Sequence, residues 1–523
     1  MTGRRSLPLG VVLLLAALLW APSLLGDFVY DDHYLIVDNP VVRSSDQVAA
    51  AFTRDYYGQR DPQRGLGYYR PITLLSHWLD WSIWGANPFG HHLTSLLLHL
   101  LATALLYLFV VETFGRPPLA LLTATIFALH PTKAASVAFV SARVDLLAAV
   151  FVLAALLCAT RNRWGPPAFY ALGLLSKEMA VTLPALLFWR LRDQARRKWL
   201  ASLVSMGVVL VAIALLRWAV LGHLSRQGAP LLDLSPHVPF LLLGDHLRNL
   251  MLPPLGILLE PPLSRLPWLL NFACLALYGL ALARLPDRRV AGWGAVWLVT
   301  HLPILGLVGL ETVVDDRFLY LPSIGFSLVA AAWIETYLER RRRAPAGGSR
   351  AVLVAVTLLT LILAPMALAR QVYWHDDLNL FEAALESQPE SADFHLKLGL
   401  ALVERRRLDQ AESEFLAGLP LADTGSVMAS WLRRNIADTY LARGRLAEAE
   451  EWYRRAVEER PDYCNGHLGL ALLLESGGRG EEALPHFKQA LSCPESAELA
   501  LRHLDSGLPT GVETGPDAGT GPR

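Results

Sequence analysis

Long uncharged apolar runs fill the first 370 residues of this 523-residue chain and constrain its fold more than any other feature. A helix needs roughly 20 apolar residues to cross the hydrocarbon core of a bilayer. Charged residues make up only 18% of the chain, whereas a soluble domain has about a quarter. The runs therefore predict a polytopic, all-helical membrane domain over residues 1–370. Eight segments are long enough to span a membrane: Leu7–Leu25, His91–Val111, Val144–Thr160, Trp199–Leu221, Leu266–Ala283, Val290–Leu310, Leu319–Leu338 and Ala351–Ala369.

Three shorter apolar segments, Pro118–Leu129, Pro166–Leu175 and Ala180–Trp189, cannot cross alone but fit tilted or paired spans. Counting them gives about eleven spans. The N-terminal run also fits a signal peptide, because two arginines precede an apolar stretch. Residues 21–26 contain no A-x-A cleavage site, so an uncleaved anchor is the favoured interpretation.

Basic residues near span ends mark the cytoplasmic side of a membrane protein. With an odd number of spans, all the basic clusters of this chain fall on one side. The region after residue 370 then falls on the side opposite to the N-terminus. We therefore expect that region and the first long loop to share the non-cytoplasmic compartment. The basic clusters are Arg4–Arg5, Arg161–Arg163, Arg190–Lys198, Arg284–Arg289 and Arg340–Arg350.

After about Tyr373 the chain is rich in Arg and Glu and has no run that could span a bilayer. Small and aromatic residues recur there with a period of 34 residues, which is similar to the paired helices of tetratricopeptide repeats. We predict a helical array over residues 371–506 that displays a concave surface for peptides or partner proteins. Its composition predicts that Gly507–Arg523 is disordered. The recurring residues are Ala437, Tyr440, Gly444, Ala449, Tyr453 and Ala456, then Ala471, Leu474, Gly478, Ala483, Phe487 and Ala490, with Gly399, Leu402, Ala411 and Phe415 as a divergent earlier copy.

Four scattered cysteines show no spacing typical of a zinc site, and a net charge of zero gives no sign of a nucleic-acid partner. In the repeat register, Cys464 begins one helix and Cys493 ends its antiparallel partner. Two unrelated small residues are the favoured interpretation. A disulfide is sterically possible if the array faces an oxidising compartment.

The expected topology places most acidic, histidine and cationic motifs on the non-cytoplasmic side. Charged groups are costly near lipid, so their concentration at one face resembles an active site. Asp31-Asp32 follows the first span, and adjacent carboxylates raise each other's pKa, which suits a general base or a metal ligand. By itself, however, the dipeptide fits a solvated loop pair better. Lys177 can bind a phosphate or belong with Glu178 to an ordinary interfacial ion pair.

Three further motifs have simple structural interpretations. Arg143 and Asp145 flank the start of a span, and their pairing with each other is favoured over a catalytic role. His130 precedes a proline and fits a turn cap better than a site residue. Asp315-Asp316-Arg317 opens a span. These residues either belong to a site or anchor the span at the membrane interface, with the two acids at the N-terminus of its helix.

Short blocks of residues follow one another in a distinctive order along almost the whole chain. They are Val29-Tyr30-Asp31-Asp32-His33 with Ile36 and Asn39, Tyr69-Arg70-Pro71-Ile72-Thr73, His91-His92-Leu93 with Leu97-Leu98-His99, His130-Pro131 through Arg143-Val144-Asp145-Leu146-Leu147, Leu175-Ser176-Lys177-Glu178, and Asp316-Arg317-Phe318-Leu319-Tyr320-Leu321-Pro322-Ser323. In this order, followed by repeats, the chain resembles the transmembrane and tetratricopeptide-repeat O-mannosyltransferases of the GT-C class of glycosyltransferases. Each block is weak alone, but the shared order is fairly specific.

This resemblance implies transfer of a sugar, expected to be mannose, from a polyprenyl-phosphate donor to a hydroxyl, expected on protein Ser or Thr. It implies a reaction on the non-cytoplasmic side without a cofactor, although the carboxylate pair leaves a divalent metal open. The chain departs from the family after His130-Pro131, where Lys133 and Ala134-Ala135 stand in place of the usual His and Glu. This departure and the short repeat array leave the sugar and the acceptor open.

Site roles follow from the same resemblance. Asp31 or Asp32 is expected to be the catalytic base, with Asp31 preferred because it matches the first acid of the loop motif. Arg70, Lys177 and Arg317 are expected to bind and neutralise the donor phosphate.

His130, Asp145 and Glu178 are expected to orient groups in the same site.

A non-catalytic membrane scaffold that recruits partners through its repeats is the main alternative to an enzyme. Convergence of the catalytic and phosphate-binding candidates in one cavity would favour the enzyme. A transporter is a weaker alternative, because no inverted repeat is visible in the hydropathy pattern. A composition rich in Ala and Leu, with Arg preferred over Lys, favours a bacterial inner-membrane protein whose repeats face the periplasm.

Overall fold

The computed structural model describes residues 3–58, 66–162, 164–224, 237–254, 267–305, 316–341 and 348–505. The regular elements in these ranges are all helices. The chain divides into two compact units, Met1–Asp376 and Asp377–Arg523, close to the predicted boundary at residue 370. The tail that was predicted to be disordered, Gly507–Arg523, lies outside the described residues.

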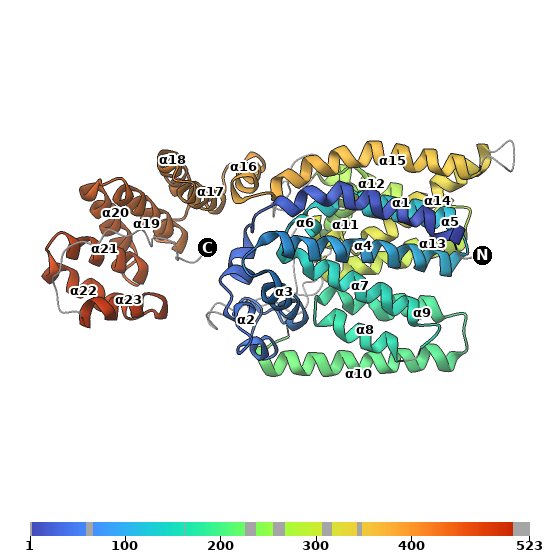
Figure 1. The fold of residues 1–523 in the computed structure, drawn as a ribbon, viewed down its shortest axis with the longest axis horizontal. Helices are drawn as coiled ribbons and strands as arrows, with labels where there is room; N and C mark the ends of the chain where they lie inside the picture. Colours follow the sequence, from blue (N-terminus) through green and yellow to red (C-terminus); the bar gives the residue numbers. More distant parts are fainter. Residues whose placement is uncertain are drawn as a thin grey trace. The chain divides into compact units, whose positions relative to one another are not determined.

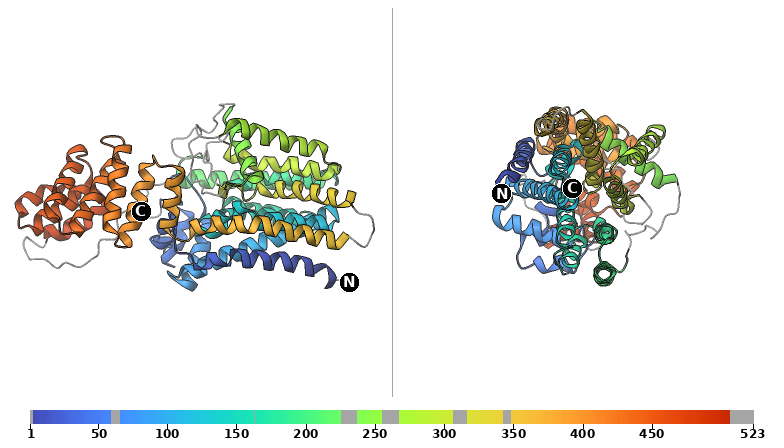
Figure 2. Two further views of the ribbon diagram at one scale, coloured as in Figure 1. Left: turned by 90° about the horizontal axis from the view of Figure 1, so that it is seen from above. Right: turned by 90° about the vertical axis from the view of Figure 1, so that its right-hand side faces the viewer.

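Most helices of the first unit run side by side along a common direction (Figures 1 and 2). Short connections join many consecutive helices, so these neighbours are antiparallel. The bundle contains α1 (Gly3–Trp20), α4 (Pro88–Phe114), α5 (Pro117–Leu129), α7 (Arg143–Cys158), α8 (Gly165–Leu174), α9 (Leu183–Leu191), α10 (Arg196–Leu221), α12 (Trp268–Arg284), α13 (Arg288–Trp297), α14 (Ser323–Arg341) and α15 (Gly348–Gln371). Shorter elements that enter the argument are α2 (Pro40–Arg43), α3 (Pro71–Trp84), α6 (Ala134–Ala138) and α11 (His237–Met251), with the turns η2 (His33–Val37), η6 (Val140–Ala142), η7 (Glu178–Thr182), η9 (Leu298–Ile304) and η10 (Asp316–Leu319).

Several of these helices are apolar enough for a membrane protein, but the predicted count of about eleven spans is not confirmed. All eleven predicted segments overlap a helix of the bundle. Proline and short helical turns interrupt some of them; the segment Val290–Leu310, for example, changes after Trp297 from α-helix to a turn that contains Pro303. Among the described residues, four helices are long and apolar enough to cross a membrane, namely Pro88–Phe114, Val140–Cys158, Arg196–Leu221 and Arg350–Trp374, and three shorter ones are apolar, namely Leu9–Leu25, Pro117–Leu129 and Trp268–Arg284.

One end of the bundle is held by arginines that pair with acidic side chains. Arg116 contacts Asp287 at 2.6 Å and Glu335 at 2.7 Å. Arg190 contacts Glu112 at 3.0 Å. These contacts bring together ends of helices that are far apart in the sequence, and several of the predicted basic clusters lie at this end.

The opposite end carries the first long loop. The backbone N–H of Asp27, just after α1, donates to the carbonyl of His375, just after α15, at 2.8 Å. The N–H of Ile72, at the start of α3, donates to the carbonyl of Leu175, after α8, at 3.2 Å. The chain therefore leaves the first unit at the end that holds the first loop.

The second unit is built from antiparallel helix pairs (Figure 1). The second and third pairs follow the predicted offset of 34 residues, from Gly444 to Gly478, whereas the first pair is offset by 38 residues, from Arg406 to Gly444. Each pair packs on the next. The pairs are α17 (Ala392–Glu404) with α18 (Leu408–Gly418), α19 (Val427–Ala442) with α20 (Leu446–Glu459), and α21 (Cys464–Ser476) with α22 (Gly480–Ala490); α16 (Asp377–Ser387) precedes them and α23 (Pro494–Asp505) follows them.

The same turn closes the first helix of each pair. Gly444 and Gly478 have φ of 72° and 74°, in the left-handed region that glycine adopts readily. The next N–H in each turn, from Arg445 or Arg479, bonds to a carbonyl five residues earlier at 2.9 Å. In the first pair Arg406 takes the glycine position with φ of 58°, which is one reason why that copy looks divergent in the sequence.

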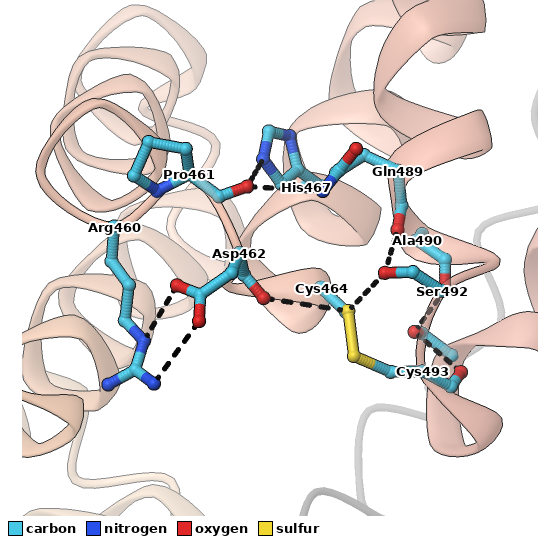
Figure 3. The surroundings of a disulfide bond; sticks show 10 residues. Arg460, Pro461, Asp462, Cys464, His467, Gln489, Ala490, Ser492 and Cys493 are labelled. Atoms are coloured by element: carbon cyan, nitrogen blue, oxygen red, sulfur yellow. Dashed lines mark hydrogen bonds and ion pairs between the residues drawn. A yellow bond between two sulfur atoms is a disulfide. The ribbon is translucent and has the colours of Figure 1, made fainter.

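Cys464 and Cys493 form a disulfide, with their Cα atoms 6.1 Å apart (Figure 3). The antiparallel packing of α21 and α22 brings the start of one helix next to the end of the other. The favoured interpretation of two unrelated residues was therefore wrong, and the alternative of a bridge is confirmed. Cys158 and Cys274, in the first unit, are free cysteines.

Candidate active site

A pocket lies at the end of the first unit that carries the first loop. Four predicted site residues line it, although they come from four separate segments: Asp31, Arg70, Lys177 and Arg317. The remaining lining residues are mostly aromatic or apolar: Leu35, Tyr56, Tyr57, Tyr68, Ser141, Val144 and Phe318. The convergence that would favour an enzyme over a scaffold is thus present for these four residues.

Asp31 follows a strained position in the backbone. Tyr30 has φ of 53°, and the left-handed region costs a residue with a side chain roughly 1–2 kcal/mol. The Asp31 carboxylate accepts a hydrogen bond from the hydroxyl of Tyr57 at 3.0 Å. Tyr57 is itself held, because its carbonyl accepts from the hydroxyl of Tyr34 at 2.6 Å. Tyr57 therefore fixes the orientation of Asp31.

Asp32 does not line the pocket and is completely buried. Its carboxylate accepts hydrogen bonds from the N–H of Val29 at 3.2 Å and from the N–H and hydroxyl of Ser141 at 2.7 and 2.5 Å. Burial raises the pKa of Asp32 to about 7, although these hydrogen bonds lower it. The structure thus separates the two acids: Asp31 faces the pocket, and Asp32 ties the first loop to η6. The interpretation of both as a solvated loop pair is wrong for Asp32.

Asp55 shapes the same loop although it was not predicted. Its carboxylate accepts from the N–H groups of Tyr57 and Gly58 at 2.8 and 2.9 Å and from those of Gly67 and Tyr68 at 2.7 and 2.8 Å. One side chain therefore holds two segments of the loop together and places two tyrosines at the pocket.

Lys177 forms a buried ion pair with Asp145, with its Nζ 2.7 and 2.9 Å from the two carboxylate oxygens. The alternative of an ion pair between Lys177 and Glu178 is wrong, because Lys177 has an extended backbone in which neighbouring side chains point to opposite sides. The predicted pairing of Arg143 with Asp145 is also wrong. Helix residues two positions apart do not face each other, and Arg143 instead contacts Asp80 at 2.5 Å.

Glu178 is shared by two arginines. Its Oε2 accepts from Arg70 at 2.9 Å, and its Oε1 accepts from Arg217 at 3.2 Å. Burial alone would raise the pKa of Glu178, but the two guanidinium groups hold it at about 2, so the carboxylate is charged. The guanidinium of Arg70 also lies over the ring of Tyr68, 4.3 Å from its centroid.

Arg317 reaches the pocket from η10, and its guanidinium lies 5.3 Å from the ring centroid of Phe318. The neighbouring Asp316 is buried in an ion pair with Arg370 of α15. Asp316 is therefore more than an acid at a helix start, since it ties η10 to the last helix of the unit. Asp315 lies outside the described residues.

His130 is not among the residues that line the pocket. Its Nε2 lies 2.9 Å from the carbonyl oxygen of Leu250, and its Nδ1 accepts from the N–H of Thr132 at 3.3 Å. These contacts match the turn cap that the sequence favoured, so the expected orienting role of His130 is not supported. Asp145 and Glu178 contact two of the residues that line the pocket, Lys177 and Arg70 respectively.

Sequence reasoning missed Tyr57, Ser141 and Arg217. Arg217 carried a usable signal, because it is the one charged residue in the apolar run Trp199–Leu221, and a charge inside a spanning helix is costly unless it has a function or a partner. Tyr57 and Ser141 carried no such signal, since tyrosine and serine are common in loops.

The chemistry of the pocket follows from its side chains. A carboxylate can accept a proton from a hydroxyl, and guanidinium and ammonium groups can neutralise a phosphate. Within the described part of the chain, no cluster of three or more His, Cys, Asp or Glu side chains is arranged to hold a metal ion. The fold and the site together define a helical membrane protein whose pocket is lined by one carboxylate and three cationic side chains and which carries a C-terminal array of helix pairs.

Known proteins match both units. The tetratricopeptide repeat family matches residues 378–426 and 434–498, so the C-terminal helix pairs are tetratricopeptide repeats, as predicted. A protein O-mannosyl-transferase of Caenorhabditis elegans is 25% identical over 429 residues, which cover 76% of this chain and 60% of that protein. Protein O-mannosyl-transferase TMTC3 of Mus musculus is 25% identical over 566 aligned positions, which cover 92% and 59%.

A third relative, protein O-mannosyl-transferase TMTC1 of Mus musculus, is 37% identical over 166 residues, which cover 30% of this chain and 17% of that protein. The chain spans about three fifths of the length of the first two relatives. These relatives confirm the predicted resemblance to O-mannosyltransferases, which are glycosyltransferases. The crystal structure of yeast Tom70 covers 77% of this chain at 13% identity with a TM-score of 0.23, which is too low to bear on the fold.

Proposed function

We propose that this chain is a membrane glycosyltransferase that moves a sugar, expected to be mannose, from a polyprenyl-phosphate donor to a hydroxyl of a protein Ser or Thr. The observation that carries the proposal is the pocket in which the Asp31 carboxylate shares a lining with Arg70, Lys177 and Arg317. A base beside three cations suits a reaction in which a hydroxyl loses a proton and a phosphate leaves. The names of the relatives support the same reaction class.

In the proposed reaction, the acceptor oxygen attacks the anomeric carbon of the donor sugar, and Asp31 takes the hydroxyl proton. The bond between that carbon and the phosphate oxygen breaks, and its electron pair leaves with the phosphate. Arg70, Lys177 and Arg317 neutralise the charge that develops on the leaving group, where preorganised cations stabilise the transition state most. The donor is a substrate, and no step of this reaction requires a cofactor.

The ion pairs around the pocket hold these groups in place. Asp145 holds the ammonium of Lys177, and Glu178 holds the guanidinium of Arg70. Both carboxylates bind cations that are themselves largely buried, so the cations are fixed before the donor arrives. Preorganisation of this kind removes the cost of reordering charged side chains during the reaction.

We further propose that the pocket and the repeats lie on the non-cytoplasmic side, in the periplasm if the chain is bacterial, and that the repeats bind the protein acceptor. The end of the bundle opposite to the pocket carries Arg116 and Arg190, and basic span ends favour the cytoplasm. The Cys464–Cys493 disulfide supports an oxidising compartment for the repeats.

Transfer by the purified full chain in proteoliposomes tests the proposal. The donor is a radiolabelled polyprenyl-phosphate mannose, the acceptors are unfolded proteins rich in Ser and Thr, and the readout is label in protein. We expect transfer by the wild type and its loss in Arg317→Gln. The matched control Arg161→Gln removes an exposed arginine from the opposite end of the bundle and should keep full activity. A scaffold predicts no transfer by any form, and that result would overturn the proposal.

A further inference from the structure

Arg217 is a buried cation near the pocket-side end of α10, in a stretch of helix that is otherwise apolar. Its guanidinium donates to Glu178 at 3.2 Å and to the carbonyl of Gly67, in the first loop, at 2.6 Å. Arg217 does not line the pocket. Arg217 can therefore affect the pocket through its charge and through these two partners, but not by direct contact with a ligand.

Glu178 connects Arg217 to the pocket. Its two carboxylate oxygens bind different arginines, Arg70 on one side and Arg217 on the other. The three side chains together carry a net charge of about +1, since Glu178 stays charged between two guanidinium groups. Without Arg217, the negative charge of Glu178 would offset that of Arg70 completely.

We propose that Arg217 is a positioning residue that keeps the charge of Arg70 available for a phosphate in the pocket. Arg217 binds Oε1 of Glu178, while Oε2 of Glu178 holds Arg70 against the ring of Tyr68. The ligand class is the phosphate of a lipid-linked sugar, so this inference rests on the proposed function. Arg217 thus contributes to the affinity for the donor phosphate without touching it.

A purely structural role for Arg217, as an anchor of the first loop through Gly67, predicts a different response to mutation. Arg217→Gln removes one positive charge in either case. If charge balance is what matters, the second substitution Glu178→Gln should restore phosphate binding in the Arg217→Gln background, because it removes the uncompensated carboxylate. If Arg217 only anchors the loop, the second substitution removes another contact and should not restore binding.

The test measures binding of undecaprenyl phosphate, which carries no sugar, to the full chain in nanodiscs. We expect Arg217→Gln to bind about tenfold more weakly, the order of effect for one unit charge removed near an anion at an intermediate dielectric constant. We expect the double variant Arg217→Gln with Glu178→Gln to bind within about threefold of the wild type. The matched control is Arg190→Gln, which breaks a comparably buried pair with Glu112 at the other end of the bundle; it should leave binding unchanged.

The outcomes separate this inference from the proposed function. If Arg217→Gln binds as tightly as the wild type, the proposed role of Arg217 is overturned. The same holds if the double variant does not recover binding. Neither result overturns the proposed function. A wild type that does not bind undecaprenyl phosphate overturns the proposed function and this role together. If Arg217→Gln does not accumulate in membranes, the variant Arg217→Lys tests the inference instead, because it keeps the positive charge. We expect it to lose about threefold or less in affinity for undecaprenyl phosphate. A loss beyond about tenfold overturns the inference.

Discussion

Reduction of the Cys464–Cys493 disulfide should weaken the last repeat locally. The bridge joins two residues that are 29 positions apart. In the chain-entropy model, a loop of this length lowers the entropy of the open state by an amount worth about 3.6 kcal/mol at 25 °C. Repeats contact mainly their neighbours, so this stabilisation should be confined to the pair α21 and α22 and to the helices beside it.

Hydrogen exchange with mass spectrometry on the full chain in detergent measures this effect. Amides in α21 and α22 exchange when the pair opens, and each 1.4 kcal/mol changes the open population about tenfold. Adding a reductant should therefore speed their exchange about 400-fold. Amides in α17 and α18, which carry no bridge, should keep their rates and serve as an internal reference.

The variant with both Cys464→Ala and Cys493→Ala should exchange like the reduced protein and should not respond to reductant. It retains Cys158 and Cys274, so any effect of the reductant on these free thiols would also be seen in the variant. An acceleration of less than about tenfold in the wild type would refute the reasoning, because loop closure would then not control the opening of this repeat.

Three further outcomes are expected. The pKa of Asp32 is raised from 3.8 to about 7 by burial, so the folded state holds this proton more tightly than the unfolded state. The stability that Asp32 contributes should be fully present below about pH 4 and should be lost as the pH rises to about 7. Thermal unfolding between pH 4 and 8 should show this fall in the wild type and a flatter profile in Asp32→Asn, and an identical slope in both would contradict it. Arg406→Gly should stabilise the pair α17 and α18 by up to about 1 kcal/mol and so slow its hydrogen exchange, because glycine adopts the positive φ of this turn without strain. Faster exchange in the variant would count against this. In intact cells, an impermeant thiol reagent should label Glu448→Cys and not Arg161→Cys in a background without free cysteines, and the reverse pattern would refute the proposed orientation.

The sequence predicted in part which segments meet at the pocket. The basic clusters and the expected span order put Asp31, Arg70, Lys177 and Arg317 on one side of the membrane, and the resemblance to a known family grouped them in one site. Span order alone does not give their convergence, because His130 was expected on the same side and does not line the pocket. The repeats were also predictable, because six positions recur with an offset of 34 residues between the second and third helix pairs, as from Gly444 to Gly478. The first pair, in which Arg406 replaces the glycine, is offset from the second by 38 residues, from Arg406 to Gly444, and was harder to recognise.

The partners of the charged residues could not be predicted from the sequence. Adjacent or nearly adjacent charges suggested pairs such as Lys177 with Glu178, but an extended backbone at Lys177 turns the two side chains to opposite sides. Likewise, the different environments of Asp31 and Asp32 depend on Tyr30 and its left-handed backbone. Such local geometry is set by packing against distant segments, which a single sequence does not display.

The roles of the two acids are tested most directly by the rate of sugar transfer from polyprenyl-phosphate mannose in single variants of Asp31 and Asp32. If Asp31 is the base, Asp31→Asn should lower the rate at saturating donor at least about a hundredfold, with donor binding intact. Asp32→Asn keeps a hydrogen-bonding side chain in a buried structural position and should lose less than about tenfold. A fully active Asp31→Asn, or a loss of activity confined to Asp32→Asn, would contradict the assignment of Asp31 as the base.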